Sequence, residues 1–197
     1  MLLRALKLFS FLSIICFCFL LFSSSYAQNG KDKKPQVRIS PKASVTQTIG
    51  FTDVTISYSR PGVKGRKIWD GLVPYDKVWR AGANEATKIT FSKDVMVEGK
   101  KLKAGSYGFF AIPTANEWTL IFNKVADQWG AFTYNEAQDA IRIKVKPVKI
   151  NYWQEWMEYT FSDMNVQKAG KNNSAMINLV WEKLKVPFKV EVTTSNK

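Results

Sequence analysis

Beyond residue 27 the chain contains neither histidine nor cysteine. Histidine is absent from the whole sequence, and the two cysteines, Cys16 and Cys18, lie close to the N-terminus. The rest of the chain therefore forms no internal disulfide, and its fold has to be held by burial of apolar side chains, for which a domain of this length suffices. Histidine or cysteine metal ligands, thiol nucleophiles and Ser-His-Asp relays are excluded by the same absence.

The first 27 residues have the pattern of a secretory signal peptide. Arg4 and Lys7 precede an apolar stretch at 8–22, and residues 25–27 (Ser-Tyr-Ala) form a small-x-small cleavage site. The apolar stretch is shorter than the ~20 residues that a membrane span needs. We therefore expect cleavage after Ala27 and an exported protein, periplasmic or extracellular, without a transmembrane segment.

Alternation of apolar and polar residues predicts an all-β fold. Val54, Ile56 and Tyr58 alternate with threonine and serine, and the same period recurs along the chain, as it does in half-buried strands. The expected strands are 45–49, 54–58, 89–91, 95–97, 102, 107–112 (a central strand), 118–122, 141–145, 177–181 and 186–192. Closely spaced strands with glycine turns favour a single antiparallel β-sandwich, jelly-roll-like, with about eight to ten strands.

The ends of this pattern suggest the domain boundaries. Residues 28–39 are polar and lysine-rich, which is typical of a flexible N-terminal segment. The alternating pattern then occupies 40–193, interpreted as one β-sandwich domain. Within it, 134–140 suits either a short helix or the start of a strand.

The charge of the chain is strongly positive. The sequence has 29 Lys and Arg against 16 Asp and Glu, a net charge of +13 that becomes +11 once Arg4 and Lys7 are removed with the leader. Such a balance favours anionic partners, and for an exported protein these are polyanionic glycans or the envelope surface, with no specific nucleic acid. The alternative is that the charge serves solubility alone. The pattern specifies no oligomeric state.

One segment, 60–86, interrupts the alternation. It contains six glycine and proline residues: Pro61, Gly62, Gly65, Gly71, Pro74 and Gly82. A connection longer than about 15 residues is unusual in a compact domain and tends to be functional. We expect one long ordered loop whose apolar anchors are Trp69, Leu72, Val73 and Val78.

Motifs in this loop and beyond it resemble the DUF2911 family. They are YSRPGVKGR at 58–66, GLVPY at 71–75, VWRAGANEAT at 78–87, AGSY at 104–107 and QWGA at 128–131. The resemblance covers most of 40–192. It implies an exported, Bacteroidetes-type, β-rich domain of unknown function, and it assigns no catalytic residue.

The loop carries the residue types of a site for a glycan or another anionic ligand. Arginine forks suit carboxylate and sulfate groups, aromatic rings stack on sugars, and amides or carboxylates bond hydroxyls. The candidate ligand-binding residues are Arg60, Lys64, Arg66, Trp69, Tyr75, Trp79, Arg80, Asn84, Glu85 and Trp129. The alternative is structural: loop arginines bond backbone carbonyls, and Trp79 belongs to the core.

Carboxylates are the main remaining route to catalysis. A glycosidase needs two carboxyl groups, about 5 Å or 6.5–9.5 Å apart. The candidates are Asp53, Asp70, Asp76, Glu85 and Asp127, with Glu85 and Asp70 considered first. We expect Arg80 beside Glu85, where it would lower the carboxyl pKa and favour an ion pair over a general acid. No Asp-x-Asp-x-Asp-Gly run occurs, so neither a metal site nor a cofactor is expected.

Two surface features complete the interpretation. Arg142, Lys144 and Lys146 share one strand face. This row of cations is expected either to bind a polyanion or to protect a sheet edge from pairing with another chain. The aromatic residues at 152, 153 and 156 form an exposed patch if their strand lies at an edge. The sequence thus favours a non-catalytic binding module associated with the envelope, with a carbohydrate-active hydrolase or lyase and a purely structural envelope protein as alternatives.

Overall fold

The computed structural model describes residues 36–168 and 172–193, and the strands in these ranges confirm the all-β prediction. The expected signal peptide at 1–27 lies outside the described residues, as does 28–35 of the expected N-terminal segment. The strands are β1 (Lys42–Ile49), β2 (Thr52–Ser59), β3 (Thr87–Phe91), β4 (Val95–Val97), β5 (Lys100–Leu102), β6 (Gly105–Ile112), β7 (Trp118–Asn123), β8 (Asp139–Val145), β9 (Val148–Asn165) and β10 (Asn172–Thr193).

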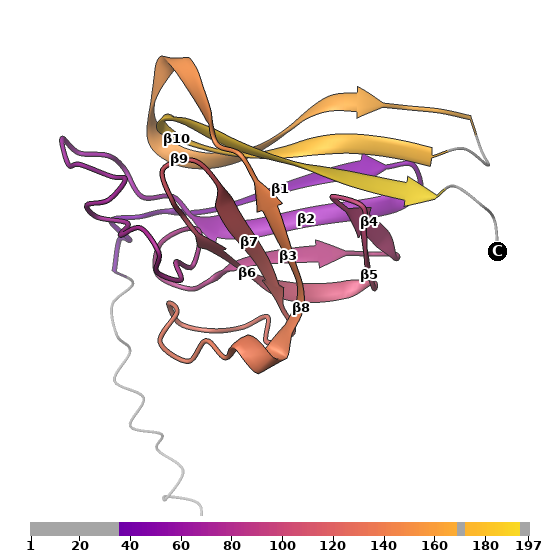
Figure 1. Ribbon diagram of the computed structural model, residues 1–197, viewed down its shortest axis with the longest axis horizontal. Coiled ribbons are helices and arrows are strands. Elements are labelled where there is room, and N and C mark those ends of the chain that lie inside the picture. The colour runs from indigo at the N-terminus through magenta and orange to yellow at the C-terminus, as the bar shows by residue number, and fades with distance from the viewer. Residues whose placement is uncertain (1–35, 169–171, 194–197) are drawn as a thin grey trace, which may run out of the picture. The chain divides into compact units, whose positions relative to one another are not determined.

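Two antiparallel sheets pack against each other without closing into a barrel (Figure 1). The larger sheet has the order β1-β2-β3-β6-β7-β8, and the smaller has the order β5-β4-β10-β9. The larger sheet is a meander from which the β4–β5 hairpin departs to join the second sheet. At the turn of that hairpin Glu98 and Gly99 both have positive φ, 46° and 75°, as the tight primed turns of two-residue hairpins require.

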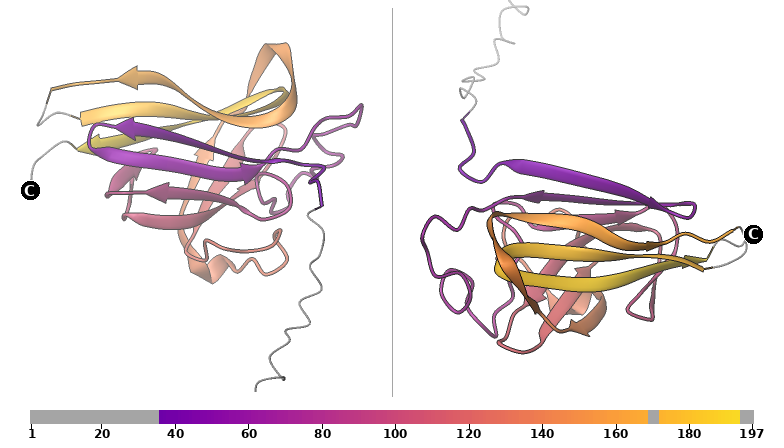
Figure 2. Two further views of the ribbon diagram at one scale, coloured as in Figure 1. Left: turned by 180° about the vertical axis from the view of Figure 1, so that it is seen from behind. Right: turned by 90° about the horizontal axis from the view of Figure 1, so that it is seen from above.

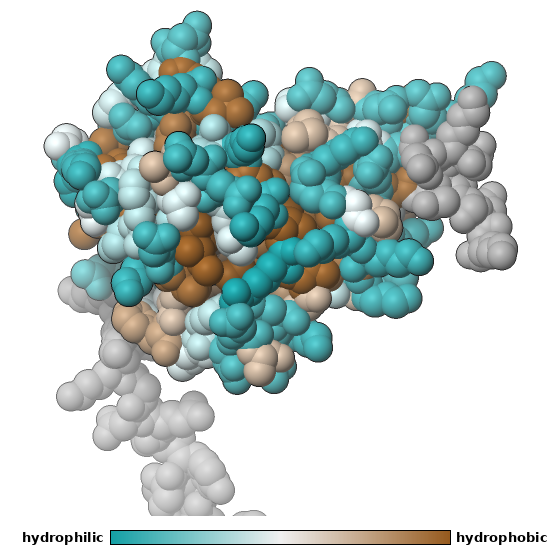
Figure 3. All heavy atoms as spheres, viewed as in Figure 1, coloured by the Kyte–Doolittle hydropathy of each residue, from teal (hydrophilic) through white to brown (hydrophobic). Residues whose placement is uncertain are grey.

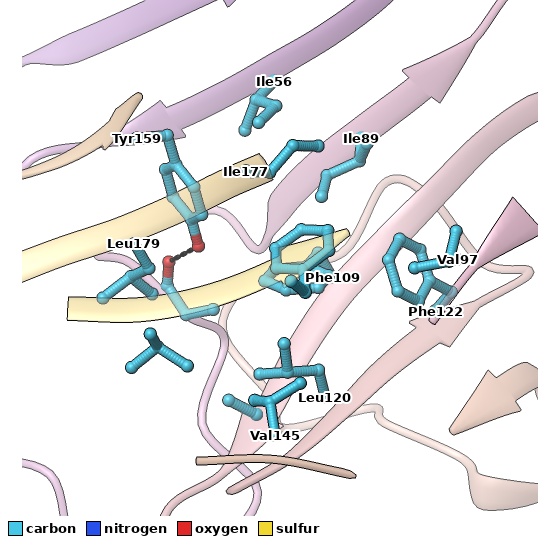
Figure 4. Close-up of a cluster of buried hydrophobic side chains, with 14 of the residues drawn as sticks. Ile56, Ile89, Val97, Phe109, Leu120, Phe122, Val145, Tyr159, Ile177 and Leu179 are labelled. Atoms are coloured by element: carbon cyan, nitrogen blue, oxygen red, sulfur yellow. Dashed lines mark hydrogen bonds between the residues drawn. The ribbon is translucent and has the colours of Figure 1, made fainter. Parts of the chain in front are cut away.

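Burial of alternate side chains between the sheets explains the strand pattern (Figure 4). Phe109 on β6 packs against Phe122 of β7, with ring centroids 5.1 Å apart, and stacks on Phe188 of β10 at 5.5 Å. Its neighbour Phe110 points to the opposite face, where it meets Tyr134 at 5.1 Å. Strand β6 is thus covered on both faces, which confirms the prediction of a central strand.

The long loop at 60–86 is ordered by backbone hydrogen bonds, and in Figure 2 it extends from one end of the sandwich. The Val63 amide donates to Glu155 on β9 at 2.9 Å, and Trp79 exchanges two bonds of 2.8 Å with Ala111 on β6. One expected anchor is wrong: Leu72 is 45% exposed, whereas Ile68, four residues earlier, is buried. Because a loop has no regular period, alternation does not show which of its aliphatic side chains points inward.

Four tryptophan side chains fill the core at the end that carries the loop. Trp69 meets Trp118 at 4.9 Å and Trp181 at 5.7 Å, both edge to face, and Trp79 stacks on Trp181 at 6.1 Å. Edge-to-face and offset contacts are the favoured geometries of aromatic pairs. The loop residues Trp69 and Trp79 therefore pack the loop onto the core of the sandwich.

The outer strand β8 shows how the larger sheet protects one edge. Before it, Glu136–Gln138 forms a 3-10 turn, and β8 then begins at Asp139, so both alternatives considered for 134–140 occur in succession. Arg142 pairs with Asp139 at 2.7 Å and Lys144 with Glu117 at 2.8 Å. Figure 3 shows hydrophilic side chains crossing a band of hydrophobic surface on the face viewed. A charged edge of this kind discourages pairing with another chain.

Candidate ligand-binding sites

The structure distributes the ten candidate residues over a pocket, a groove and the loop packing. Lys64, Arg66, Trp79, Arg80 and Asn84 line a cavity of about 270 Å³ that we call the Arg80 pocket. The rest of its lining is Ile39, Ser40, Pro61, Gly62, Leu72, Val73, Gly82, Ala83 and Trp181.

A second cavity, of about 700 Å³, contains the candidates Glu85 and Trp129, and we call it the Trp129 groove. The rest of its lining is Lys42, Ala43, Ser44, Ser57, Tyr58, Ser59, Ala86, Lys88, Ala126, Asp127 and Gln128. The remaining candidates, Arg60, Trp69 and Tyr75, line neither cavity. The loop was thus expected to carry one site, and the structure divides its residues between two.

Among the residues that the structure describes, Arg80 is the cation of the pocket whose side chain has no protein partner. Its Nε–H is buried and finds no acceptor within hydrogen-bonding distance among the described residues, although most buried polar groups are paired. Burial lowers the pKa of the guanidinium from its ordinary value, yet arginine remains charged at neutral pH. The pocket therefore contains a charged, partly desolvated group in its lining.

Two further cations line the same pocket. The Arg66 guanidinium donates from Nε to the Val63 carbonyl at 3.1 Å and from Nη2 to the Gly62 carbonyl at 2.6 Å. The Lys64 ammonium lies over the Trp156 ring, 5.5 Å from its centroid. No Asp or Glu occurs in the lining, so its formal charge is positive.

Arg60 has a structural role in this arrangement. Its Nε donates to the Met157 carbonyl at 2.8 Å, and its Nη2 lies 3.1 Å from a carboxylate oxygen of Glu158. These bonds fix the start of the loop to β9, outside the pocket. For Arg60 and Arg66 the geometry thus matches the structural alternative of arginines that bond loop carbonyls, and for Arg80 it does not.

The wall of the pocket includes the stacked rings of Trp79 and Trp181. Trp79 is buried, and its Nε1 donates to the Gly82 carbonyl at 3.2 Å. Asn84 is held by a bond of 3.2 Å from Nδ2 to the Ser40 carbonyl. Trp181 was not among the candidates, because the alternation on its strand marked it simply as core.

Glu85 lies in the groove, and its neighbour is Arg38 rather than the expected Arg80. Both guanidinium Nη atoms of Arg38 donate to the carboxylate, at 2.7 and 2.8 Å, and the Lys42 ammonium lies 3.4 Å away. The hydrogen bonds from Arg38 lower the pKa of Glu85 to about 2. The residue is ionised at every ordinary pH, as a structural ion pair requires and a general acid does not. Arg38 precedes the alternating pattern, so the pattern could not reveal the pair.

The groove lies where the segment after β7 crosses the larger sheet near β1–β3. The Ala86 amide donates to the Gln128 carbonyl at 2.9 Å, and the Gly130 amide donates to the Asn84 carbonyl at 3.0 Å. These bonds fix Trp129 between them, although its side chain is 59% exposed. Sequence reasoning found Trp129 but missed the serines and lysines of the strands, because alternation shows that a residue such as Ser57 faces outward but not what covers it.

The second catalytic candidate, Asp70, is not brought together with Glu85. Asp70 is exposed, pairs with Lys67 at 3.7 Å and lines neither cavity. The carboxyl group that shares the groove with Glu85 is Asp127, which pairs with Lys88 at 2.8 Å.

Over the described ranges, no group of three acidic side chains is placed to hold a metal ion, and no helix is long and apolar enough to span a membrane.

An aromatic patch lies beside the Arg80 pocket. Strand β9 is the outer strand of its sheet, and Tyr152, Trp153 and Trp156 on it are 50%, 51% and 37% exposed. The condition set for an exposed patch is therefore met. Trp156 contacts the pocket directly, since it forms an isolated bridge with Gly62 and its ring lies beneath Lys64.

The fold and these sites define a two-sheet β-sandwich with a basic pocket beneath a long ordered loop and a polar groove beside it. The family model described as "Protein of unknown function (DUF2911)" matches residues 40–190, and the chain belongs to that family. Neither a curated protein nor a solved structure matches the chain.

Proposed function

We propose that the protein is an exported, non-catalytic binding protein whose ligand is anionic, an acidic saccharide in the first place, held in the Arg80 pocket. The observation that carries the proposal is the Arg80 guanidinium, half-buried and without a partner among the described residues. It shares its pocket with Lys64 and Arg66 and with no carboxylate. Export rests on the signal-peptide pattern of 1–27.

The electrostatic argument favours an anion over a neutral ligand. Burying a charge without a partner is costly, and a planar guanidinium is best satisfied by two oxygens of a carboxylate or sulfate. Arg66 adds charge at its fixed position, and the exposed Lys64 adds a second charge above the Trp156 ring. The net positive charge of the whole chain raises the local concentration of anions around it.

The aromatic patch supports a saccharide as the carrier of the negative charge. Trp156 bridges to Gly62 of the pocket lining, and Tyr152 and Trp153 are exposed on the same strand, β9. Aromatic rings present an apolar face with a polar edge, which suits a sugar chain. A cavity of about 270 Å³ accommodates one acidic unit while neighbouring units contact the aromatic rings.

The proposal is tested by thermal shift with heparin oligosaccharides and oligogalacturonides as acidic probes and maltohexaose as the neutral probe. Because a ligand that binds the native state stabilises it, an acidic probe should raise the Tm of the protein. The rise should disappear in Arg80→Met and persist in Lys77→Met, which removes one exposed charge of the same loop outside the pocket. An absent rise, or an equal rise in Arg80→Met, would overturn the proposal.

The catalytic alternative is less well supported by the geometry. Asp70 lies outside both cavities, and Asp127, which shares the groove with Glu85, pairs with Lys88 at 2.8 Å. Glu85 itself is held ionised by its ion pair with Arg38. A general acid needs a pKa near the working pH, which this ion pair prevents. The purely structural alternative does not explain why Arg80 is half-buried without a partner among the described residues.

A further inference from the structure

The Trp129 groove differs in chemistry from the Arg80 pocket. Each cation of its lining faces a carboxylate: Lys42 lies 3.4 Å from Glu85, and Lys88 lies 2.8 Å from Asp127. The charges of the lining therefore balance. Because each cation already has its counter-ion, the groove offers an anion little attraction.

Hydroxyl and amide groups supply the rest of the polar lining. Ser44 on β1 and Ser57 on β2 are cross-strand partners whose hydroxyls lie 3.3 Å apart. Gln128, in the segment after β7, also lines the groove. Hydroxyl groups both donate and accept, so this surface matches a ligand that is itself rich in hydroxyls.

The apolar part of the lining is dominated by one exposed ring. Trp129 is 59% exposed, and Ala43, Ala86 and Ala126 provide small apolar surfaces beside it. The backbone on both sides of Trp129 is hydrogen-bonded to the 84–86 segment. An aromatic ring carried on a rigid backbone loses little entropy when it binds a ligand.

We propose that the Trp129 groove is a second binding site, which takes an uncharged saccharide. Trp129 stacks on the C–H face of a sugar ring, and Ser44, Ser57 and the paired carboxylates bond its hydroxyls. The volume of about 700 Å³ lies within the range of about 300–1,000 Å³ usual for ligand sites and accommodates more than one sugar ring.

The two sites are separate although they share a wall. Asn84 and Glu85 are consecutive, and the first lines the Arg80 pocket whereas the second lines the Trp129 groove. No residue lines both cavities. The inference therefore goes beyond the proposed function, and each site can be tested without the other.

The test is an NMR titration of the indole N–H signals with cellohexaose, maltohexaose, xylohexaose and laminarihexaose. The Trp129 signal, identified by its loss in Trp129→Ala, should shift with at least one of these probes. Trp129→Ala should weaken that binding at least tenfold, since stacking is lost while the exposed position leaves the fold intact. Phe132→Ala is the matched control, because Phe132 is 83% exposed in the same segment and lies outside the groove. Arg80→Met should bind the neutral probe as the wild type does.

Three results would overturn the inference. One is an unshifted Trp129 signal with all four hexaoses up to about 10 mM, a concentration that reveals millimolar affinity. Another is equal affinity in Trp129→Ala. The third is binding of the neutral probe that is lost in Arg80→Met, which would assign the saccharide to the other cavity.

Discussion

Arg38 and Glu85 form a two-pronged ion pair that ties the chain just before β1 to the end of the long loop. The bonds are 2.7 and 2.8 Å long, and both side chains are 38% exposed. Glu85 also forms part of the wall between the two cavities. The pair therefore positions a binding surface, and its stabilising effect is moderated by solvent.

The pKa of Glu85 leads to a prediction about pH. Because folding lowers this pKa from 4.5 to about 2, the pair stabilises the protein fully above pH 4.5 and loses its effect as the pH falls towards 2. In Glu85→Gln the Tm at pH 7 should fall by about 1–3 °C, and its difference from the wild type should shrink between pH 4.5 and 2. Calorimetry of both proteins across this range measures the effect, and a constant difference would contradict it.

Gly108 on β6 allows the segment after β7 to approach the sheet. A Cβ at this position would lie 2.6 Å from the carbonyl oxygen of Val125, and a backbone atom cannot move aside as a side chain end can. Gly108→Ala should destabilise the protein by about 1–3 kcal/mol and displace the segment that carries Trp129. Denaturant unfolding measures the first effect.

Gly99→Ala serves as the control for Gly108→Ala. Its Cβ would meet open space, so the cost comes from its positive φ of 75° alone. Loss of the Trp129 response to a neutral hexaose in Gly108→Ala, but not in Gly99→Ala, would link the close approach to the groove. An unchanged response in both variants would show that ligand binding in the Trp129 groove does not depend on the close approach at Gly108.

Two tyrosines that link the sheets should differ in their importance. Tyr159 donates from its hydroxyl to the Ala81 carbonyl at 2.8 Å (dashed in Figure 4), but Thr87 donates to the same oxygen. Tyr159→Phe should therefore cost about 1 kcal/mol, the net value of one hydrogen bond. The Tyr58 hydroxyl instead accepts from the buried Tyr159 amide at 3.1 Å. Tyr58→Phe leaves that donor unpaired and should cost up to about 3 kcal/mol; urea unfolding that ranks the two variants in reverse would refute the argument.

The strands were predictable because burial between two sheets imposes a period of two, as at Val54, Ile56 and Tyr58. The β4–β5 hairpin agrees with the expected strands at 95–97 and 102, which leave Glu98 and Gly99 between them for the turn. What alternation could not reveal was the partner of each side chain across long sequence separations. Arg38 and Glu85 are 47 positions apart, and nothing in the local pattern of either residue identifies the other.

The candidate sites show the same limit in another form. The loop composition pointed to a cationic site, and Lys64, Arg66 and Arg80 do share a pocket. The Arg80 pocket is separated from the Trp129 groove at Asn84, which has a φ of 58°. Asn84 lines the pocket, and the next residue, Glu85, lines the groove. Asparagine adopts this left-handed conformation more readily than most residues, but the sequence alone does not show where it does so.

Gly82, in the lining of the Arg80 pocket, is another place where a missing side chain allows close packing. A Cβ at this position would lie 2.8 Å from Thr87 Oγ1, which donates to the Ala81 carbonyl. Gly82→Ala should destabilise the protein by about 1–3 kcal/mol, because the buried threonine cannot rotate without losing its bond. The clash involves a side chain, so it can be relieved by a second substitution. In a double-mutant cycle with Thr87→Ala, Gly82→Ala should cost at least about 0.5 kcal/mol less than in the wild type. Equal costs in the two backgrounds would show that the strain arises elsewhere, such as at the Ser59 carbonyl 3.4 Å away.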